Sequence, residues 1–143
     1  MRILISACLL GVPCRYDGAS KLHPLAAALA ARHTLVPACP EQLGGLPTPR
    51  PPAERQGGAV RTRTGADVTE NYRRGAEETL RLCRLLDCRA AVLKERSPSC
   101  GCGEIYDGTF TGTRISGDGV TAEMLKAQGV PVYGESHIRD LLS

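Results

Sequence analysis

The sequence lacks tryptophan, contains one phenylalanine and has three lysines beside 15 arginines. With so few aromatic side chains, it offers no platform on which the bases of a nucleic-acid strand would stack. The net charge of +3 is a mild excess that does not require a polyanionic partner. No run approaches the ~20 consecutive apolar residues of a membrane helix. We therefore expect neither a nucleic-acid partner nor membrane association.

The N-terminal region also lacks the pattern of an export signal. An apolar run follows Met1 and Arg2, but Gly11, Pro13 and Arg15 break it early. We therefore expect a cytoplasmic protein. Seven cysteines are many for 143 residues, yet their number is odd and no export signal precedes them, so a disulfide framework is not expected. Such cysteines are more often metal ligands, redox groups or core residues.

Apolar runs alternate with helical patterns along the chain. The runs are too continuously apolar for half-exposed strands, which predicts buried parallel strands over residues 2–6, 34–37, 90–94 and 130–133. Apolar spacing of three to four predicts helices over residues 24–33, 69–86, 121–128 and 136–142, with Thr69 and Ser136 as caps. Right-handed βαβ units then give an α/β fold. We expect one three-layer domain, residues 1–143, with a central parallel sheet of Rossmann-like or flavodoxin-like type.

The connecting segments are long. Residues 39–58 are rich in proline and glycine and are predicted to be irregular, and a small hairpin is predicted over residues 59–68. Residues 95–119 are predicted to form a glycine-rich loop. A long loop in a small domain is usually functional or disordered. Because the first of these loops begins at a candidate ligand, Cys39, function is favoured there.

Three cysteines each follow a predicted strand. Cys8 follows the first strand, Cys39 follows the second, and Cys100 lies a short loop after the third. In an open α/β sheet, ligands bind just beyond the carboxyl ends of the strands. Three thiols delivered there can converge on one metal or cluster. The alternative interpretation is that all three are core residues at strand ends.

The other cysteines are weaker candidates. Cys83 lies on the apolar face of the helix over 69–86, together with Tyr72, and is expected in the core. Cys88 lies in a turn before the strand predicted over residues 90–94, at the end opposite the expected site. Cys14 and Cys102 are close in sequence to candidate ligands, although the two side chains of a Cys-x-Cys pair often point apart.

Long motifs surround the three strand-end cysteines. They read Ser-Ala-Cys-Leu-Leu-Gly at 6–11, Arg-Tyr-Asp-Gly at 15–18, Cys-Pro-Glu at 39–41, Gly-Gly-Leu at 44–46, Pro-Arg-Pro-Pro-Ala-Glu at 49–54 and Leu-Lys-Glu-Arg-Ser-Pro-Ser-Cys-Gly at 93–101. Over essentially its whole length the chain closely resembles the DUF523 family, which includes the thiouracil desulfidases.

The resemblance implies a [4Fe–4S] cluster held by Cys8, Cys39 and Cys100. The fourth iron would have no protein ligand and would bind the sulfur of a small thiolated substrate, although Cys14 or Cys102 could close that position. An acid/base pair would map to Glu41 and a serine, with Ser97 favoured over Ser99. The implied activity replaces sulfur by oxygen without net redox change, in a monomer or homodimer.

The chemistry suits these residue types. Soft thiolates favour iron–sulfur clusters, and an open iron can act as a Lewis acid toward a thiocarbonyl sulfur. Glu41 could take a proton from water, or could instead be a helix cap or the partner of an arginine. Ser97 could equally be a turn residue before Pro98.

Weaker predictions concern two polar segments. Residues 15–17 could orient a heterocycle, although Asp17 and Gly18 also suit a plain turn. Residues 94–96 could pair with Glu54 or with substrate. Two other function classes remain open: a non-catalytic metal- or persulfide-binding module, and a thiol-redox enzyme with a reversible disulfide.

Overall fold

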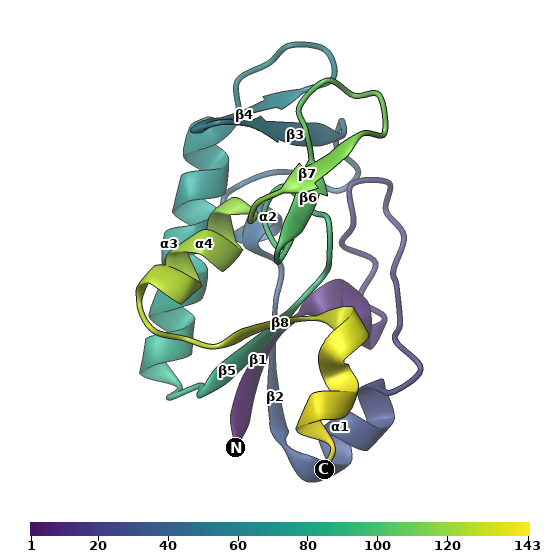
Figure 1. Ribbon diagram of the computed structural model, residues 1–143, viewed down its shortest axis with the longest axis vertical. Helices are drawn as coiled ribbons and strands as arrows, with labels where there is room; N and C mark the ends of the chain where they lie inside the picture. The colour runs from purple at the N-terminus through teal and green to yellow at the C-terminus, as the bar shows by residue number, and fades with distance from the viewer.

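A computed structural model describes residues 1–143, and its centre is a four-stranded parallel sheet in the order β2-β1-β5-β8 (Figure 1). The strands are β1 (Arg2–Ser6), β2 (Thr34–Ala38), β5 (Ala90–Leu93) and β8 (Val132–Gly134). All three pairings are parallel. The prediction of an α/β fold around a parallel sheet is therefore confirmed.

Helices cover both faces of the sheet because the strand side chains alternate between two cores. Ile3 and Ile5 pack on one face with α1 (Ala26–Arg32) and the 3-10 helix η2 (Glu135–Leu141). Leu4, between them, packs on the other face with the remaining long helices, α3 (Thr69–Leu85) and α4 (Val120–Ala127). A further 3-10 turn, η1 (Ala7–Leu10), follows β1 directly. The three layers match the prediction.

The segment predicted to be irregular, residues 39–58, contains regular structure. It holds a one-turn helix, α2 (Pro40–Leu43), and the strand β3 (Ala53–Gln56). Pro40 occupies the first position of α2, where its missing N–H costs nothing. β3 pairs with β4 (Ala59–Thr62) in an antiparallel hairpin. The hairpin predicted over 59–68 is formed only in part: one antiparallel bridge joins Arg61 to Asp67, and the N–H groups of Thr62 and Val68 donate to the carbonyls of Ala66 and Val60.

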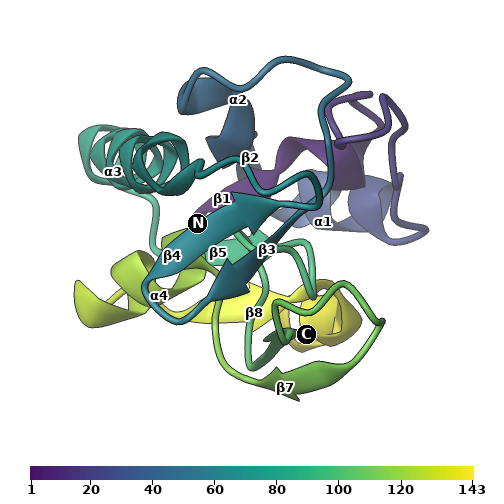
Figure 2. The ribbon, with the colours of Figure 1, turned by 90° about the horizontal axis from the view of Figure 1, so that it is seen from above.

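The predicted loop over 95–119 also contains a hairpin, formed by β6 (Glu104–Tyr106) and β7 (Arg114–Ser116). Both hairpins lie beyond the carboxyl ends of the central strands (Figures 1 and 2). They are joined to each other, because Glu54 Oε1 of β3 accepts hydrogen bonds from the backbone N–H groups of Gly108 and Phe110. The two loops therefore form one cover over the end of the sheet.

Neither predicted cap residue caps its helix. Thr69 is the first residue of α3, and its Oγ1 instead accepts a hydrogen bond from the backbone N–H of Val60, which ties the helix to β4. Ser136 donates to Glu95 across 2.5 Å. Long-range partners thus replace the local hydrogen bonds that the sequence pattern suggested.

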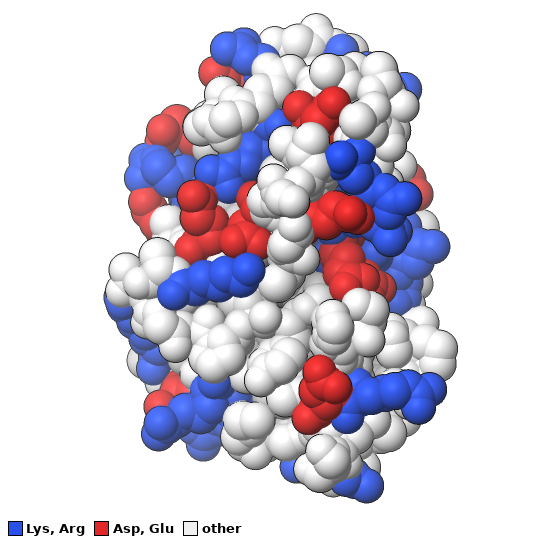
Figure 3. Space-filling model, in the orientation of Figure 1, with Lys and Arg blue, Asp and Glu red and all other residues white.

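No helix combines the length and the apolar character needed to cross a bilayer. On the face shown in Figure 3, basic and acidic side chains are interspersed. On helix α3, Arg73 pairs with Glu70 and Glu77, and Arg81 pairs with Glu78. Exposed pairs of this kind add little to the free energy of unfolding.

Helix α2 is held against α3 at unusually short range. A Cβ placed on Gly75 would lie 1.9 Å from the carbonyl oxygen of Pro40, and one on Gly44 would lie 2.0 Å from that of Asn71. The Asn71 side chain adds a hydrogen bond of 2.9 Å to the Gly44 carbonyl. Only glycine fits at either position. This contact fixes the place of α2, which begins directly after Cys39 and carries Glu41.

We expect Gly75→Ala to lower the free energy of unfolding by about 2 kcal/mol, because the added methyl group must push α2 away from α3. At an unconstrained helical site the same change would stabilise the protein by about 0.5–1 kcal/mol. A loss of stability in Gly75→Ala would therefore indicate the close contact between the two helices. Urea unfolding measures it. Gly58→Ala is the matched control, since nothing lies within 4 Å of its added Cβ. A stabilised Gly75→Ala variant would contradict the close contact.

Candidate functional site

A cavity of about 490 Å³ lies between the carboxyl ends of the central strands and the two hairpins. Its walls come from the segments after β1, β2 and β5 and from the hairpin cover. The order of the sheet explains this position. β2 and β5 lie on opposite sides of β1, so the chain leaves the strand ends in two directions and opens a crevice there.

The three cysteines predicted at strand ends, Cys8, Cys39 and Cys100, all line this cavity. Cys8 lies in η1 after β1, Cys39 precedes α2, and Cys100 lies on the loop after β5. Cys8 and Cys100 are buried, and Cys39 is partly exposed. The structure therefore brings the three thiols to one cavity. Their role as joint ligands stays a prediction.

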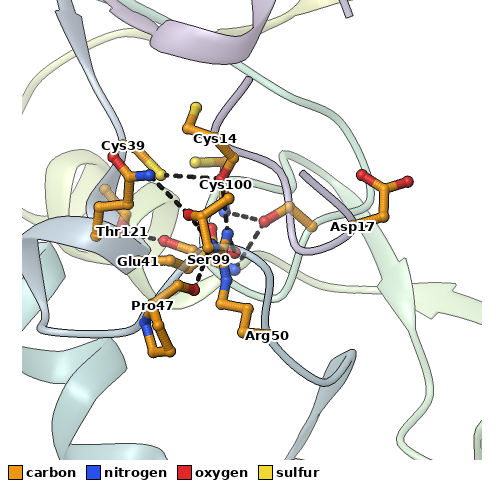
Figure 4. Close-up of polar contacts among 12 residues, drawn as sticks. Cys14, Asp17, Cys39, Glu41, Pro47, Arg50, Ser99, Cys100 and Thr121 are labelled. Carbon is orange, nitrogen blue, oxygen red and sulfur yellow. Dashed lines mark hydrogen bonds and ion pairs between the residues drawn. The ribbon is translucent and has the colours of Figure 1, made fainter. Parts of the chain in front are cut away.

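Of the other four cysteines, only Cys14 reaches the cavity. It lies beside Cys39, whose thiol donates to the Cys14 carbonyl oxygen across 3.7 Å (Figure 4). Cys102 instead points its thiol at the carbonyl of Val132 in β8. Cys83 is buried in the core between α3 and the sheet, as predicted, with its thiol on the Cys88 carbonyl.

Burial controls the protonation of these thiols. It raises the pKa of Cys8 to about 11, although Lys94 and Arg15 oppose the shift, and it raises the pKa of Cys14 to about 12. The pKa of Cys100 is raised well above its usual range, first by burial and then by the negative charge of Glu41. Burial therefore favours the protonated thiol at Cys8, Cys14 and Cys100 in the cluster-free chain. Metal coordination would displace their protons.

The donor set suits a cluster better than a single ion. All seven cysteines are free, so none is consumed by a disulfide. No three His, Cys, Asp or Glu side chains converge closely enough to hold one metal ion. A zinc-like ion takes all its ligands on one atom, whereas an iron–sulfur cluster is held by thiolates on separate irons. The thiols of Cys8, Cys39 and Cys100, which come from three separate segments around one cavity, fit the second arrangement.

Glu41 lines the cavity and is paired with a buried arginine. Arg50 Nη2 donates to Glu41 Oε2 across 2.8 Å, and the Arg50 side chain is only 4% exposed (Figure 4). The same guanidinium donates to the carbonyl oxygens of Cys14 and Pro47. Burial disfavours its charge, but Glu41 outweighs burial and the pKa of Arg50 is raised. The arginine partner considered from sequence is therefore present.

The two candidate serines differ in position. Ser97 lines the cavity, and its Oγ accepts hydrogen bonds from the backbone N–H groups of Ser99 (3.1 Å) and Cys100 (3.0 Å). Ser99 is fully buried away from the cavity and shares a hydrogen bond of 2.8 Å with Thr121. Only Ser97 is therefore placed to meet a bound molecule.

The sequence analysis also suggested roles for residues 15–17 and 94–96, and the structure shows which of these residues line the cavity. Arg15 and Tyr16 line the cavity, whereas Asp17 closes a local turn through the N–H of Ala19 and lies away from the cluster of thiols in Figure 4. Lys94 pairs with Glu135 across 2.6 Å. Of the two pairings considered for residues 94–96, the one with Glu54 is not formed, because the Glu54 carboxylate binds backbone N–H groups instead. All three residues line the cavity, and their contact with substrate stays a prediction.

Arg50 and Tyr72 line the cavity but were not identified as functional from the sequence. The local sequence around Arg50 does not indicate that it pairs with Glu41. Tyr72 lies on the apolar face of α3 and was expected in the core; it is 3% exposed, yet it lines the cavity. Burial, reinforced by Glu41, raises the pKa of its phenol far above the usual range, so the hydroxyl keeps its proton.

Comparison with known proteins gives three findings. The sequence profile of the family described as 2-thiouracil desulfurase matches residues 3–137. An uncharacterised Bacillus subtilis protein, YbbK, is 45% identical over 150 residues, covering 98% of this chain and 99% of the relative. A solved structure, the [4Fe-4S]-dependent thiouracil desulfidase TudS, is 50% identical with a TM-score of 0.93, over 98% of this chain and 94% of the other.

We expect Arg50→Met to lower the free energy of unfolding of the cluster-free protein by about 3 kcal/mol, because it leaves a largely buried carboxylate and two carbonyls without their donor. Arg81→Met is the matched control: its pair with Glu78 is exposed, so its effect is expected to stay below about 1 kcal/mol. Equal effects of the two substitutions in urea unfolding would contradict the structural role of the buried pair.

Proposed function

The chain belongs to the 2-thiouracil desulfurase family, and we propose that it replaces the sulfur of a small thiolated heterocycle by oxygen, using a [4Fe–4S] cluster held by Cys8, Cys39 and Cys100. Family membership makes it a desulfidase, and the relative of 50% identity supports the [4Fe–4S] cofactor. The observation that carries the finer proposal is the meeting of three strand-end thiols, one carboxylate and one serine hydroxyl at a single cavity.

The three thiols come from segments that the sheet brings together, so they can hold the cluster on one side of the cavity. When bound, the cluster supplies a Lewis-acidic iron that polarises the thiocarbonyl of the substrate. A cavity of about 490 Å³ is within the usual size range of small-molecule sites. We propose that residues 1–143 act as one domain, either as a monomer or as a homodimer.

Glu41 is proposed as the base that takes a proton from the attacking water. Its Oε2 is engaged by Arg50, and its Oε1 makes no hydrogen bond with the protein, so one carboxylate oxygen is left to accept the proton. The buried guanidinium keeps the carboxylate in one orientation. The pair therefore positions a carboxylate oxygen at the wall of the cavity.

Ser97 is proposed as the complementary donor. Because its oxygen already accepts two backbone N–H bonds, its own hydrogen is free to be donated to a bound molecule. The reaction balances without an oxidant or reductant: water adds its oxygen to the carbon of the C=S bond, sulfide leaves, and the two protons of water end on sulfide. Glu41 accepts a proton in the first step, and Ser97 donates a hydrogen bond to the group that gains charge.

We expect Cys8→Ala, Cys39→Ala and Cys100→Ala each to lose the cluster after anaerobic reconstitution with iron and sulfide. The visible absorption band and the iron content measure this. Cys83→Ala is the control that should keep both, because its thiol lies in the core. Cys14→Ala is also expected to keep the cluster. Loss of the cluster in this variant would show that Cys14 is a ligand. A wild-type protein that binds no iron would contradict the cluster and favour a thiol-redox function.

We expect Glu41→Gln to retain the cluster but to lower turnover of 2-thiouracil by about 100-fold or more, since the amide cannot accept the proton. Ser97→Ala should lower turnover with the cluster also retained. Ser99→Ala should leave turnover unchanged, because its hydroxyl does not reach the cavity. Uracil formation and the visible spectrum are measured on the same samples. Loss of the cluster in Glu41→Gln would show instead that the residue is structural.

A further inference from the structure

The hydroxyl of Tyr72 is an unused donor at the wall of the cavity. The residue is 3% exposed and lines the cavity, yet its hydroxyl makes no hydrogen bond with the protein. The only side-chain nitrogen or oxygen that is both fully enclosed and unpartnered is Arg50 Nε. The Tyr72 hydroxyl is therefore not enclosed by protein, and it reaches the open space of the cavity.

The position of this phenol is well defined. Tyr72 lies in the first turns of α3, one helical turn before Gly75, on the part of the helix that packs against α2. Its charged or ionisable neighbours are Glu41, Arg50, Cys39 and Cys100, which are the groups assigned above to the base and to cluster ligation. The hydroxyl therefore faces the place where the reacting part of the substrate must lie.

The packing of the protein does not require an oxygen on Tyr72, because phenylalanine would fill the same apolar volume. Polar groups of largely buried residues are normally hydrogen-bonded. The Tyr72 hydroxyl has no partner in the protein and lines the cavity, so its partner must come from the cavity. Here that partner is a molecule in the cavity.

We propose that Tyr72 contacts the substrate directly, donating a hydrogen bond from its phenol to an oxygen or nitrogen on the edge of the thiolated heterocycle. This inference rests on the proposed function and adds a residue that orients the ring. Acting together with the water-activating Glu41, Tyr72 would fix which edge of the ring faces the base. The heterocycles preferred are those with a hydrogen-bond acceptor near the thiocarbonyl carbon.

The test is Tyr72→Phe in the reconstituted protein. We expect kcat/KM for 2-thiouracil to fall by about 3- to 10-fold, as for the loss of one hydrogen bond between uncharged groups. The melting temperature and the cluster absorption should not change, since the hydroxyl has no protein partner to lose. Tyr133→Phe is the matched control: the same atom is removed from a residue of the core that does not line the cavity.

A second substrate separates a direct contact from an indirect one. 2-Thiopyrimidine lacks the exocyclic carbonyl oxygen of 2-thiouracil, and a direct bond to that oxygen predicts that Tyr72→Phe narrows the difference in kcat/KM between the two compounds. If the bond goes to a ring nitrogen, both compounds lose equally. Unchanged kcat/KM for both would overturn the inference while leaving the desulfidase function intact. A wild-type protein without turnover would instead contradict the proposed function.

Discussion

The guanidinium of Arg50 is almost fully buried, and its donors end on the loop after β1 and on the segment after β2. Its own backbone N–H binds the carbonyl of Tyr16, which adds a further tie to the first loop. Neither loop has a sheet or a long helix of its own to hold it. A single charged side chain therefore ties Cys14 to Glu41, whose helix α2 is also held by its close contact with α3. A buried charge is tolerated there because a carboxylate and two carbonyls surround it.

The central fold could be predicted because its signals are local. β1 and β5 are continuously apolar, and the spacing in α3 gives one apolar face, so the pattern is sufficient to identify them. The hairpins could not be predicted in this way. β3 reads Ala-Glu-Arg-Gln, which is polar, so its sequence does not mark it as a strand even though its partner β4 follows directly. The contact of Glu54 with the distant N–H of Gly108 has no local signal either.

The candidate site, like the fold, could be predicted only in part. Strand ends predicted that Cys8, Cys39 and Cys100 would meet, and the family resemblance, now confirmed, added Glu41 and Ser97. Tyr72 was missed because the spacing that places a residue on the inner face of a helix does not say whether that face meets a core or a cavity. The inner face of α3 meets both a core and the cavity. Leu80 and Cys83, further along the helix, pack in the core, whereas Tyr72 lines the cavity.

The three thiols are far apart in sequence, at positions 8, 39 and 100, and each depends on a different strand for its place. A cofactor bound by all three would act as a cross-link between β1, β2 and β5. Its binding energy would then be coupled to folding, and each would favour the other. The site also has no precursor in a partly synthesised chain, since the strand that delivers Cys100 is the third of the four. The three thiols are therefore brought together only when β1, β2 and β5 have paired.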